Sequence, residues 1–134
     1  MQGSSEPSIE IANVGVGRIG IESTTLNVTL SINNPIPVGG VLKSAKFRIF
    51  LLKNGEESFL GEGRKDNIRI EGGQITQTEI PVNLKNTAVI SAAGGLIGSD
   101  LDIVVRGTAS IDLKIAAPEI PFEKKVKIGG FLKG

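Results

Sequence analysis

The chain of 134 residues contains no cysteine, histidine, tyrosine or tryptophan. The lack of cysteine excludes disulfide bridges, thiolate metal ligands and a cysteine nucleophile. The lack of histidine removes the usual general base near neutral pH and the commonest zinc ligand. An enzyme that relies on carboxylates or lysine alone would still be chemically possible. This inventory nevertheless favours a protein without catalytic activity, cofactor or metal.

An excess of charge of one sign is also missing, because 15 basic and 14 acidic residues give a net charge of +1. Nucleic-acid-binding proteins are usually strongly basic and expose aromatic side chains, whereas five phenylalanines are the only aromatic residues here. We therefore expect no nucleic-acid partner. The densest basic cluster, Lys124, Lys125 and Lys127, is expected on a solvated strand face, and contact with an anionic membrane is the alternative.

Long apolar runs are absent as well, so the sequence predicts no membrane-spanning helix. Residues 1–7 lack the basic start and apolar centre of a signal peptide and are interpreted as a flexible leader. A cytoplasmic location is expected for the chain as given, and a membrane-anchored or exported one if the native N-terminus is longer. Apolar residues make up 40% of the chain, enough for one globular domain over 8–128 with a tail at 129–134.

What the sequence does contain is a clear period of two. Apolar residues at 26, 28, 30 and 32 alternate with polar ones at 27, 29, 31 and 33, as in a half-buried β-strand. Asn34 and Pro35 end this strand, because proline supplies no N–H and restricts the residue before it. The asparagine side chain can also bond to nearby backbone. We therefore expect Asn34 and Pro35 to form a structural turn.

Similar patterns predict the other strands, separated by turn signals. Asn54-Gly55 is typical of a hairpin, and Val38-Gly39-Gly40 predicts a turn with room for positive φ angles. Residues 61–63 predict a bend, Gly107 a β-bulge, and Pro81 a sheet edge or bulge. The expected strands cover residues 8–21 (bent at glycines), 24–34, 43–53, 57–61, 65–71, 74–84, 100–115 and the segment that ends at 128.

Two further segments depart from simple alternation. Phe50 and Leu52 are apolar on the otherwise polar face of the strand at 43–53, which suggests burial on both sides or a covering helix. Residues 86–95 are rich in alanine and end in paired glycines, so they predict one short helix, capped by Asn86 or Thr87. About seven strands and one helix indicate a mainly β protein, an antiparallel β-sandwich of immunoglobulin or fibronectin type III type, with a barrel as the alternative.

Several patterns that could carry chemistry have simpler structural interpretations. Residues 15–20 match the G-x-G-x-x-G dinucleotide fingerprint, but a strand and not a helix follows them, so we expect a bent strand. Asp100, Asp102 and Asp112 would form a weak cation site only if their strand folded back on itself. These aspartates are expected instead on ordinary exposed faces.

The remaining candidates are equally unspecific. Glu56-Glu57 and the pair Glu62 with Asp66 could act as paired carboxylates, yet solvated loops explain them better. The serines at 4, 5, 91 and 99 have no histidine partner. Val89, Ile90 and the residues near 96–97 give an apolar helix face, which suits a lid on a core better than a lipid groove.

The run from Leu26 to Val38 with Asn34-Pro35, the strand Phe47-Arg48-Ile49-Phe50-Leu51, the hairpin that reaches Gly61 and the run Ile80-Pro81-Val82 together resemble the WHy domain. This domain is named for water stress and hypersensitive response and occurs in atypical, folded late embryogenesis abundant proteins and their archaeal and bacterial relatives. The resemblance covers residues 8–128. Ile36 departs from the common Asn-Pro-Asn signature, which leaves the turn itself intact.

The resemblance implies a β-sandwich with a short helix and a non-enzymatic role in protection against desiccation, cold or heat. It implies weak contacts with protein clients or membrane surfaces, and no catalytic residues to carry over. We expect a monomer without a small-molecule substrate. The alternatives are an adhesion or assembly module of a membrane-anchored or secretion-associated complex, and a small-ligand or lipid carrier, which would need a sizeable cavity between the sheets.

Overall fold

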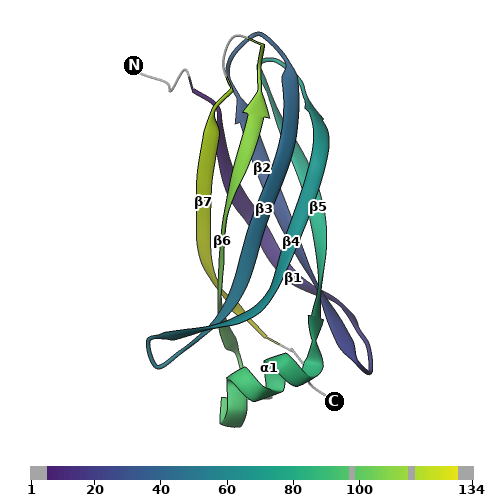
Figure 1. Ribbon diagram of the computed structural model, residues 1–134, viewed down its shortest axis with the longest axis vertical. Coiled ribbons are helices and arrows are strands. Elements are labelled where there is room, and N and C mark those ends of the chain that lie inside the picture. The colour runs from purple at the N-terminus through teal and green to yellow at the C-terminus, as the bar shows by residue number, and fades with distance from the viewer. Residues whose placement is uncertain (1–5, 97–98, 115–116, 130–134) are drawn as a thin grey trace.

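The computed structural model describes residues 6–96, 99–114 and 117–129. These residues form two antiparallel sheets packed face to face, with a short helix across one end (Figure 1). The predicted β-sandwich is therefore confirmed. In chain order the elements are β1 Ser8–Ile19, β2 Ser23–Asn34, β3 Gly40–Lys53, β4 Glu56–Ile70, β5 Gln74–Lys85, α1 Asn86–Ala93, the short 3₁₀ helix Gly94–Leu96, β6 Leu101–Asp112 and β7 Glu119–Ile128.

One sheet has the strand order β1-β2-β5, and the other has the order β4-β3-β6-β7. The fourth strand pairs with the third, whereas in constant-type immunoglobulin domains it lies in the other sheet. Strand β1 runs beside β7, and β4 runs beside β5, so the two sheets approach each other along both sides (Figure 1). Predictions that concern residues 1–5, 97–98, 115–116 and 130–134 lie outside the described residues. They include parts of the leader and the tail, and Ser4 and Ser5.

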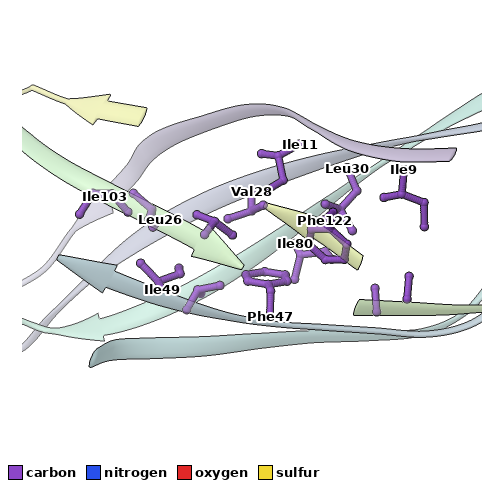
Figure 2. Packing of buried hydrophobic residues seen from close by; sticks show 14 of the residues in the cluster. Ile9, Ile11, Leu26, Val28, Leu30, Phe47, Ile49, Ile80, Ile103 and Phe122 are labelled. Atoms are coloured by element: carbon purple, nitrogen blue, oxygen red, sulfur yellow. The ribbon is translucent and has the colours of Figure 1, made fainter. Parts of the chain in front are cut away.

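The core lies between the sheets and consists of aliphatic side chains with two phenylalanines (Figure 2). Phe47 of β3 and Phe122 of β7 meet edge to face, with ring centroids 6.4 Å apart. Successive side chains of a strand point to opposite faces, and in β2 every second residue from Thr24 to Asn34 is buried. The apolar residues of the first identified strand, Leu26, Val28, Leu30 and Ile32, are all fully buried.

Strand β2 pairs with β5 over twelve residues without interruption. Pro81 lies within this ladder, and β5 is an edge strand, as the proline predicts. The β3–β4 hairpin is also confirmed. Asn54 and Gly55 have φ angles of 53° and 81°, the two positive values that a two-residue hairpin turn requires.

The predicted bend at residues 61–63 is wrong, because β4 is one continuous strand through them. The register shifts nearby, between the pairs Ile49–Gly61 and Phe50–Phe59, which leaves one extra residue in β4. The physical role of Gly63 is to make room: it stands opposite Phe47, and a Cβ there would collide with the phenylalanine ring.

The bulge predicted at Gly107 is also wrong, since β6 pairs through this residue with both neighbours without a shift. Phe47 of β3 pairs with Gly63 of β4 on one side and with Gly107 of β6 on the other. A Cβ at Gly107 would collide with the carbonyl oxygen of Lys46. Positive φ angles are likewise not found at Gly39 and Gly40. Gly40 instead begins β3, where the carbonyl of Asp112 leaves no space for a side chain.

The helix lies at one end of the sandwich (Figure 1) and not over the outer face of β3, so the predicted covering helix is wrong. Its first residue follows Lys85, whose side chain makes no capping hydrogen bond, and the predicted cap by Asn86 or Thr87 is wrong too. Gly94 ends the helix with a φ of 56°, as the paired glycines predict. The buried side of the helix presents Val89 and Ala93 to the core.

Candidate functional site

Asn34 is fully buried at the end of β2 and ties three segments together. Its side-chain Nδ2 donates hydrogen bonds to the carbonyl oxygens of Val38, at 3.0 Å, and Glu71, at 3.1 Å. Its Oδ1 accepts a hydrogen bond from the backbone N–H of Ile36 at 3.2 Å. Every polar atom of this side chain thus serves the backbone. The Asn34-Pro35 segment holds the turn after β2 against the β4–β5 turn and offers no free group to a ligand.

Asn86 makes a second buried clamp at the opposite end of the sandwich. Its Nδ2 donates to the carbonyl oxygens of Gly20 and Ile21, at 3.0 and 2.9 Å. Thr24 donates its Oγ1 hydrogen to Asn86 Oδ1 at 2.9 Å, and the backbone N–H of Asn86 donates to Glu22 O. Sequence reasoning placed Asn86 at a helix cap, whereas the side chain fixes the turn between β1 and β2.

The glycine-rich fingerprint at residues 15–20 forms no nucleotide loop. Most of it belongs to β1, which pairs with β2 and shifts register twice. No helix follows it, so the amide groups and helix dipole that would hold a pyrophosphate are missing at this point. The bent-strand interpretation is therefore confirmed.

The acidic candidates do not converge on one another. Asp102 and Asp112 are at the two ends of the continuous strand β6, which places them roughly 30 Å apart at about 3.3 Å per residue. Asp102 pairs with Lys127 at 3.1 Å, and Asp112 accepts a hydrogen bond from the backbone of Lys114. Within residues 6–96, 99–114 and 117–129, no group of three or more metal-ligating side chains is close enough to hold an ion.

Three carboxylates of β4 pair with arginines instead of with each other. Asp66 contacts Arg64 at 3.0 Å, and Glu62 lies 3.9 Å from Arg48. Glu57 accepts two hydrogen bonds from Arg106 of β6, at 3.0 and 2.8 Å. The lysines of β7 also have separate partners. Lys124 Nζ donates to the carbonyl of Ile11 in β1 at 3.2 Å, whereas the side chain of Lys127 pairs with Asp102 of β6.

The outer face of the four-stranded sheet carries the most organised group of polar and aromatic side chains in the described chain. Phe50 and Phe59 meet edge to face with centroids 6.1 Å apart. The Arg48 guanidinium lies 5.6 Å from the Phe59 centroid, and the Arg106 guanidinium lies 5.3 Å from that of Phe50, both within the range of cation–π attraction. We call Arg48, Phe50, Phe59, Val104 and Arg106 the aromatic–arginine patch.

Two glutamates hold Arg106 in place from either side. Besides its two bonds to Glu57, it donates from Nε and Nη2 to Glu123 at 3.0 and 2.8 Å. The hydrogen bonds from Arg106 hold the pKa of Glu57 below its usual value, and the hydrogen bonds to Glu57 and Glu123 raise the pKa of Arg106 further. Glu57 and Arg106 are therefore charged throughout the physiological pH range.

Sequence analysis did not identify this patch, although part of it could have been found. A two-residue turn at Asn54-Gly55 sets Phe50 opposite Phe59 by counting outward from the turn. No comparable local signal exists for Arg106. It lies 49 residues from Glu57, and only the pairing of β3 with β6 brings the two together.

Two shallow grooves adjoin the patch, one lined by Lys46, Glu62, Arg64 and Thr108, and one by Pro121, Phe122 and Glu123. Another hollow, at the opposite end, is lined by residues of the β2–β3 and β4–β5 turns and of the adjoining strand ends, among them Arg69, and by Lys114. Open, mixed-charge surfaces of this kind suit reversible contacts with a macromolecule better than enclosure of a small substrate. In the part of the chain that the structure describes, no helix is long and apolar enough to cross a membrane.

No protein-family model matches this chain. It is 26% identical over 123 residues to the uncharacterized protein MJ1138 of Methanocaldococcus jannaschii, an alignment that covers 92% of this chain and 70% of that protein. The name of that protein assigns no activity, so the similarity by itself indicates no function.

Solved structures with similar folds include the following three. A crystal structure of a protein from Archaeoglobus fulgidus has a TM-score of 0.65 at 16% identity and covers 94% of this chain and 98% of its own. The solution structure of AT1g01470 from Arabidopsis thaliana has a TM-score of 0.70 at 19% identity, with 92% and 82% covered. That of At2g46140.1, a protein assigned provisionally to the late embryogenesis abundant proteins, has 0.64 at 15%, with 92% and 70% covered. The chain thus shares a fold with a late embryogenesis abundant-like protein.

Proposed function

We propose that this protein is a non-enzymatic stress-protection protein that stabilises other proteins during desiccation, cold or heat. The observation that carries the proposal is that all four edge strands of the sandwich are modified against pairing with another chain. An exposed strand edge presents unpaired N–H and C=O groups and is a template for aggregation. A protein that must stay dispersed while its solution becomes crowded and dry needs protected edges.

Two of the edges are protected by proline. Pro81 of β5 and Pro121 of β7 lie within ladders that continue without a register shift. Proline has no N–H, so in an unbroken ladder the missing donor is one that would have pointed away from the neighbouring strand. An approaching strand therefore finds no hydrogen-bond donor at these two positions.

The other two edges are irregular. Strand β1 has two register shifts, and Lys124 of β7 donates to the carbonyl of Ile11 beside the first of them. Strand β4 has an extra residue at Leu60 and a positive φ of 57° at Asn67. Bulges, left-handed residues and lysines at an edge are devices that prevent edge-to-edge association. They also disfavour strand exchange, which the alternative role as an assembly module would use.

The fold shared with a late embryogenesis abundant-like protein supports the same proposal. The lack of histidine and cysteine supports a role without catalysis. We further propose that residues 8–128 act as one unit and as a monomer, since contacts with clients would be weak and reversible. Weak contacts suffice when the protein is abundant and the client is only briefly unfolded.

The test is the residual activity and light scattering of a labile reporter enzyme carried through drying, freeze–thaw and heating. An equal mass of an unrelated stable β-sandwich serves as the control for nonspecific crowding. We expect higher residual activity and lower scattering than with the control sandwich. Protection equal to that of the control would overturn the proposal.

A further inference from the structure

The tip of the β3–β4 hairpin carries the only Asn-Gly pair in the sequence, Asn54-Gly55. Both residues are exposed, and a Cβ added to Gly55 would meet no heavy atom within 4 Å beyond its chain neighbours. In the part of the chain that the structure describes, no hydrogen bond holds the Asn54 side chain. Figure 1 shows this hairpin extending away from the body of the sandwich. The Asn54 amide is therefore open to water and free to change its conformation.

The residue that follows an asparagine decides how easily the side chain can react with the backbone. Glycine has no Cβ, so nothing hinders the approach of the Gly55 nitrogen to Asn54 Cγ. Asn67 makes a close comparison, because it is also exposed and has a φ of 57°, against 53° for Asn54. It is followed by the β-branched Ile68, whose side chain crowds the backbone nitrogen. The sequence therefore favours a reaction at Asn54 over one at Asn67.

We propose that Asn54 is a modification site at which this protein forms isoaspartate without an enzyme. The backbone nitrogen of Gly55 loses its proton to hydroxide and attacks Cγ of Asn54. A new N–Cγ bond forms, the Cγ–Nδ2 bond breaks, and the Nδ2 group takes up a proton and leaves as ammonia. One water molecule then opens the five-membered imide ring at either carbonyl, which gives aspartate or isoaspartate. Nothing is oxidised or reduced.

The reaction requires a brief opening of the turn and no more. The left-handed φ angles of Asn54 and Gly55 belong to the closed hairpin turn, and the attack needs a rotation of the backbone between the two residues. The pair that closes the turn is Lys53 with Glu56, so only the end of the ladder has to separate. Such a local opening costs far less free energy than global unfolding.

Two other asparagines are protected against the same reaction. The side chains of Asn34 and Asn86 are buried and hydrogen-bonded through both their nitrogen and their oxygen. Asn34 is also followed by Pro35, which has no N–H to lose. Burial and bonding thus leave the hairpin tip, and not the two clamps, as the reactive position.

The product changes the hairpin in a definite way. In isoaspartate the main chain runs through the side-chain carbons, so the turn becomes one carbon longer. Because turn geometry sets the register of a hairpin, we expect the pairs Lys53–Glu56 and Leu52–Glu57 beside the turn to loosen. Either product also adds one negative charge, which lowers the net charge from +1 to zero.

The experiment ages the full chain at mildly alkaline pH, where more of the amide nitrogen is deprotonated. Peptide mass mapping locates the exchange of NH₂ for OH, and an isoaspartyl carboxyl methyltransferase with radioactive S-adenosylmethionine labels isoaspartate. We expect ammonia release, and both signals on the peptide that contains Asn54. Asn67 should react at least roughly tenfold more slowly, which corresponds to about 1.4 kcal/mol in the activation barrier.

Variants locate the site and separate charge from backbone. Asn54→Gln should abolish the methyl label, because its longer side chain would have to close a six-membered ring. The matched control, Asn67→Gln, should leave the label unchanged. Asn54→Asp supplies the charge without the extra backbone carbon, so the ¹⁵N amide spectrum of the fresh variant should change less at residues 52–57 than that of aged wild-type protein.

Each outcome bears on one step of the proposal. A label that survives Asn54→Gln, or that appears on the Asn67 peptide as fast as on the Asn54 peptide, would overturn the assignment of the site. Equal spectral changes in Asn54→Asp and in the aged protein would overturn the effect on the hairpin register. Label confined to Asn54, with larger changes in the aged protein, would confirm both.

Discussion

Thr24 donates its hydroxyl hydrogen to the side-chain oxygen of Asn86 over 2.9 Å, across 62 positions of the chain. Both residues are buried. Together they connect the β1–β2 turn to the start of the helix, at the end of the sandwich where Figure 1 places both elements. One hydrogen-bonded asparagine thus ties the start of the helix to the β1–β2 turn.

The first prediction concerns this clamp. Asn86→Ala leaves the carbonyls of Gly20 and Ile21 and the hydroxyl of Thr24 without a partner, so we expect the free energy of unfolding to fall by about 2–3 kcal/mol. Urea denaturation followed by circular dichroism measures the change. The matched control is Asn83→Ala, which removes an exposed hydrogen bond to Thr25 and should cost less than about 0.5 kcal/mol. Similar losses for both variants would show that the clamp does not contribute.

The second prediction concerns Asn34. Asn34→Asp keeps the shape but replaces the donor group by an oxygen that faces the carbonyls of Val38 and Glu71. We expect destabilisation of about 2–4 kcal/mol at pH 7. These carbonyls should raise the pKa of the new carboxyl in the folded state, so the destabilisation should shrink as the pH falls from this raised folded-state value to the unfolded value of about 4. The control is Asn33→Asp at the exposed neighbouring position. Its stability should equal that of the wild-type protein both at pH 7 and near pH 4, at about the unfolded pKa.

The third prediction concerns the space around the Phe47 ring. Gly63→Ala should destabilise the protein by about 1–3 kcal/mol through overpacking. Adding Phe47→Leu should recover part of this loss, because the smaller side chain removes the collision. Gly107→Ala should not be rescued by the same second substitution, since its Cβ meets the backbone oxygen of Lys46. Thermal unfolding of the three single variants (Gly63→Ala, Gly107→Ala and Phe47→Leu) and the two double variants measures both couplings.

The fourth prediction is a pH dependence at Glu57. The hydrogen bonds from Arg106 hold the folded-state pKa of this carboxyl below its usual value of 4.5, so its contribution to stability is complete above about pH 4.5 and is lost as the pH falls through the folded-state value. The Tm of the wild-type protein should therefore exceed that of Glu57→Gln by a constant amount from pH 5 to pH 8. This difference should shrink below about pH 4.5. A difference that grows with acidity would contradict the assignment.

The fifth prediction concerns the protected edges. Pro121→Val restores a backbone N–H at the β7 edge, so we expect faster growth of light scattering at high protein concentration with little change in Tm. Pro37→Val, in the exposed turn after β2, is the control and should scatter like the wild-type protein. An increase in scattering for both variants would point to lost turn rigidity instead of a restored edge.

Much of the fold could be predicted from local patterns. Alternation over residues 26–33 identified β2, its buried face and its end at Asn34, because side-chain direction in a strand depends only on the position along it. The hairpin at Asn54-Gly55 could be predicted for a similar reason, since the positive φ angles it needs suit these residues. The irregularities predicted from the glycines at 63 and 107 were wrong. Both positions need glycine because they lie opposite Phe47, where a side chain would have no room. That neighbour is known only once strands from distant parts of the chain have paired.

Composition and period-two patterns are properties of the chain alone, so they were enough to predict a β-sandwich with one helix and to exclude histidine and cysteine chemistry. Three features depended on tertiary structure: which strands became edges, the clamping of a turn by Asn86 instead of a helix cap, and the contacts of Arg106 with Glu57, Glu123 and Phe50. The physical reason is the same in each case. These contacts join residues from separate strands, and their energies exist only after the sheets have formed and packed.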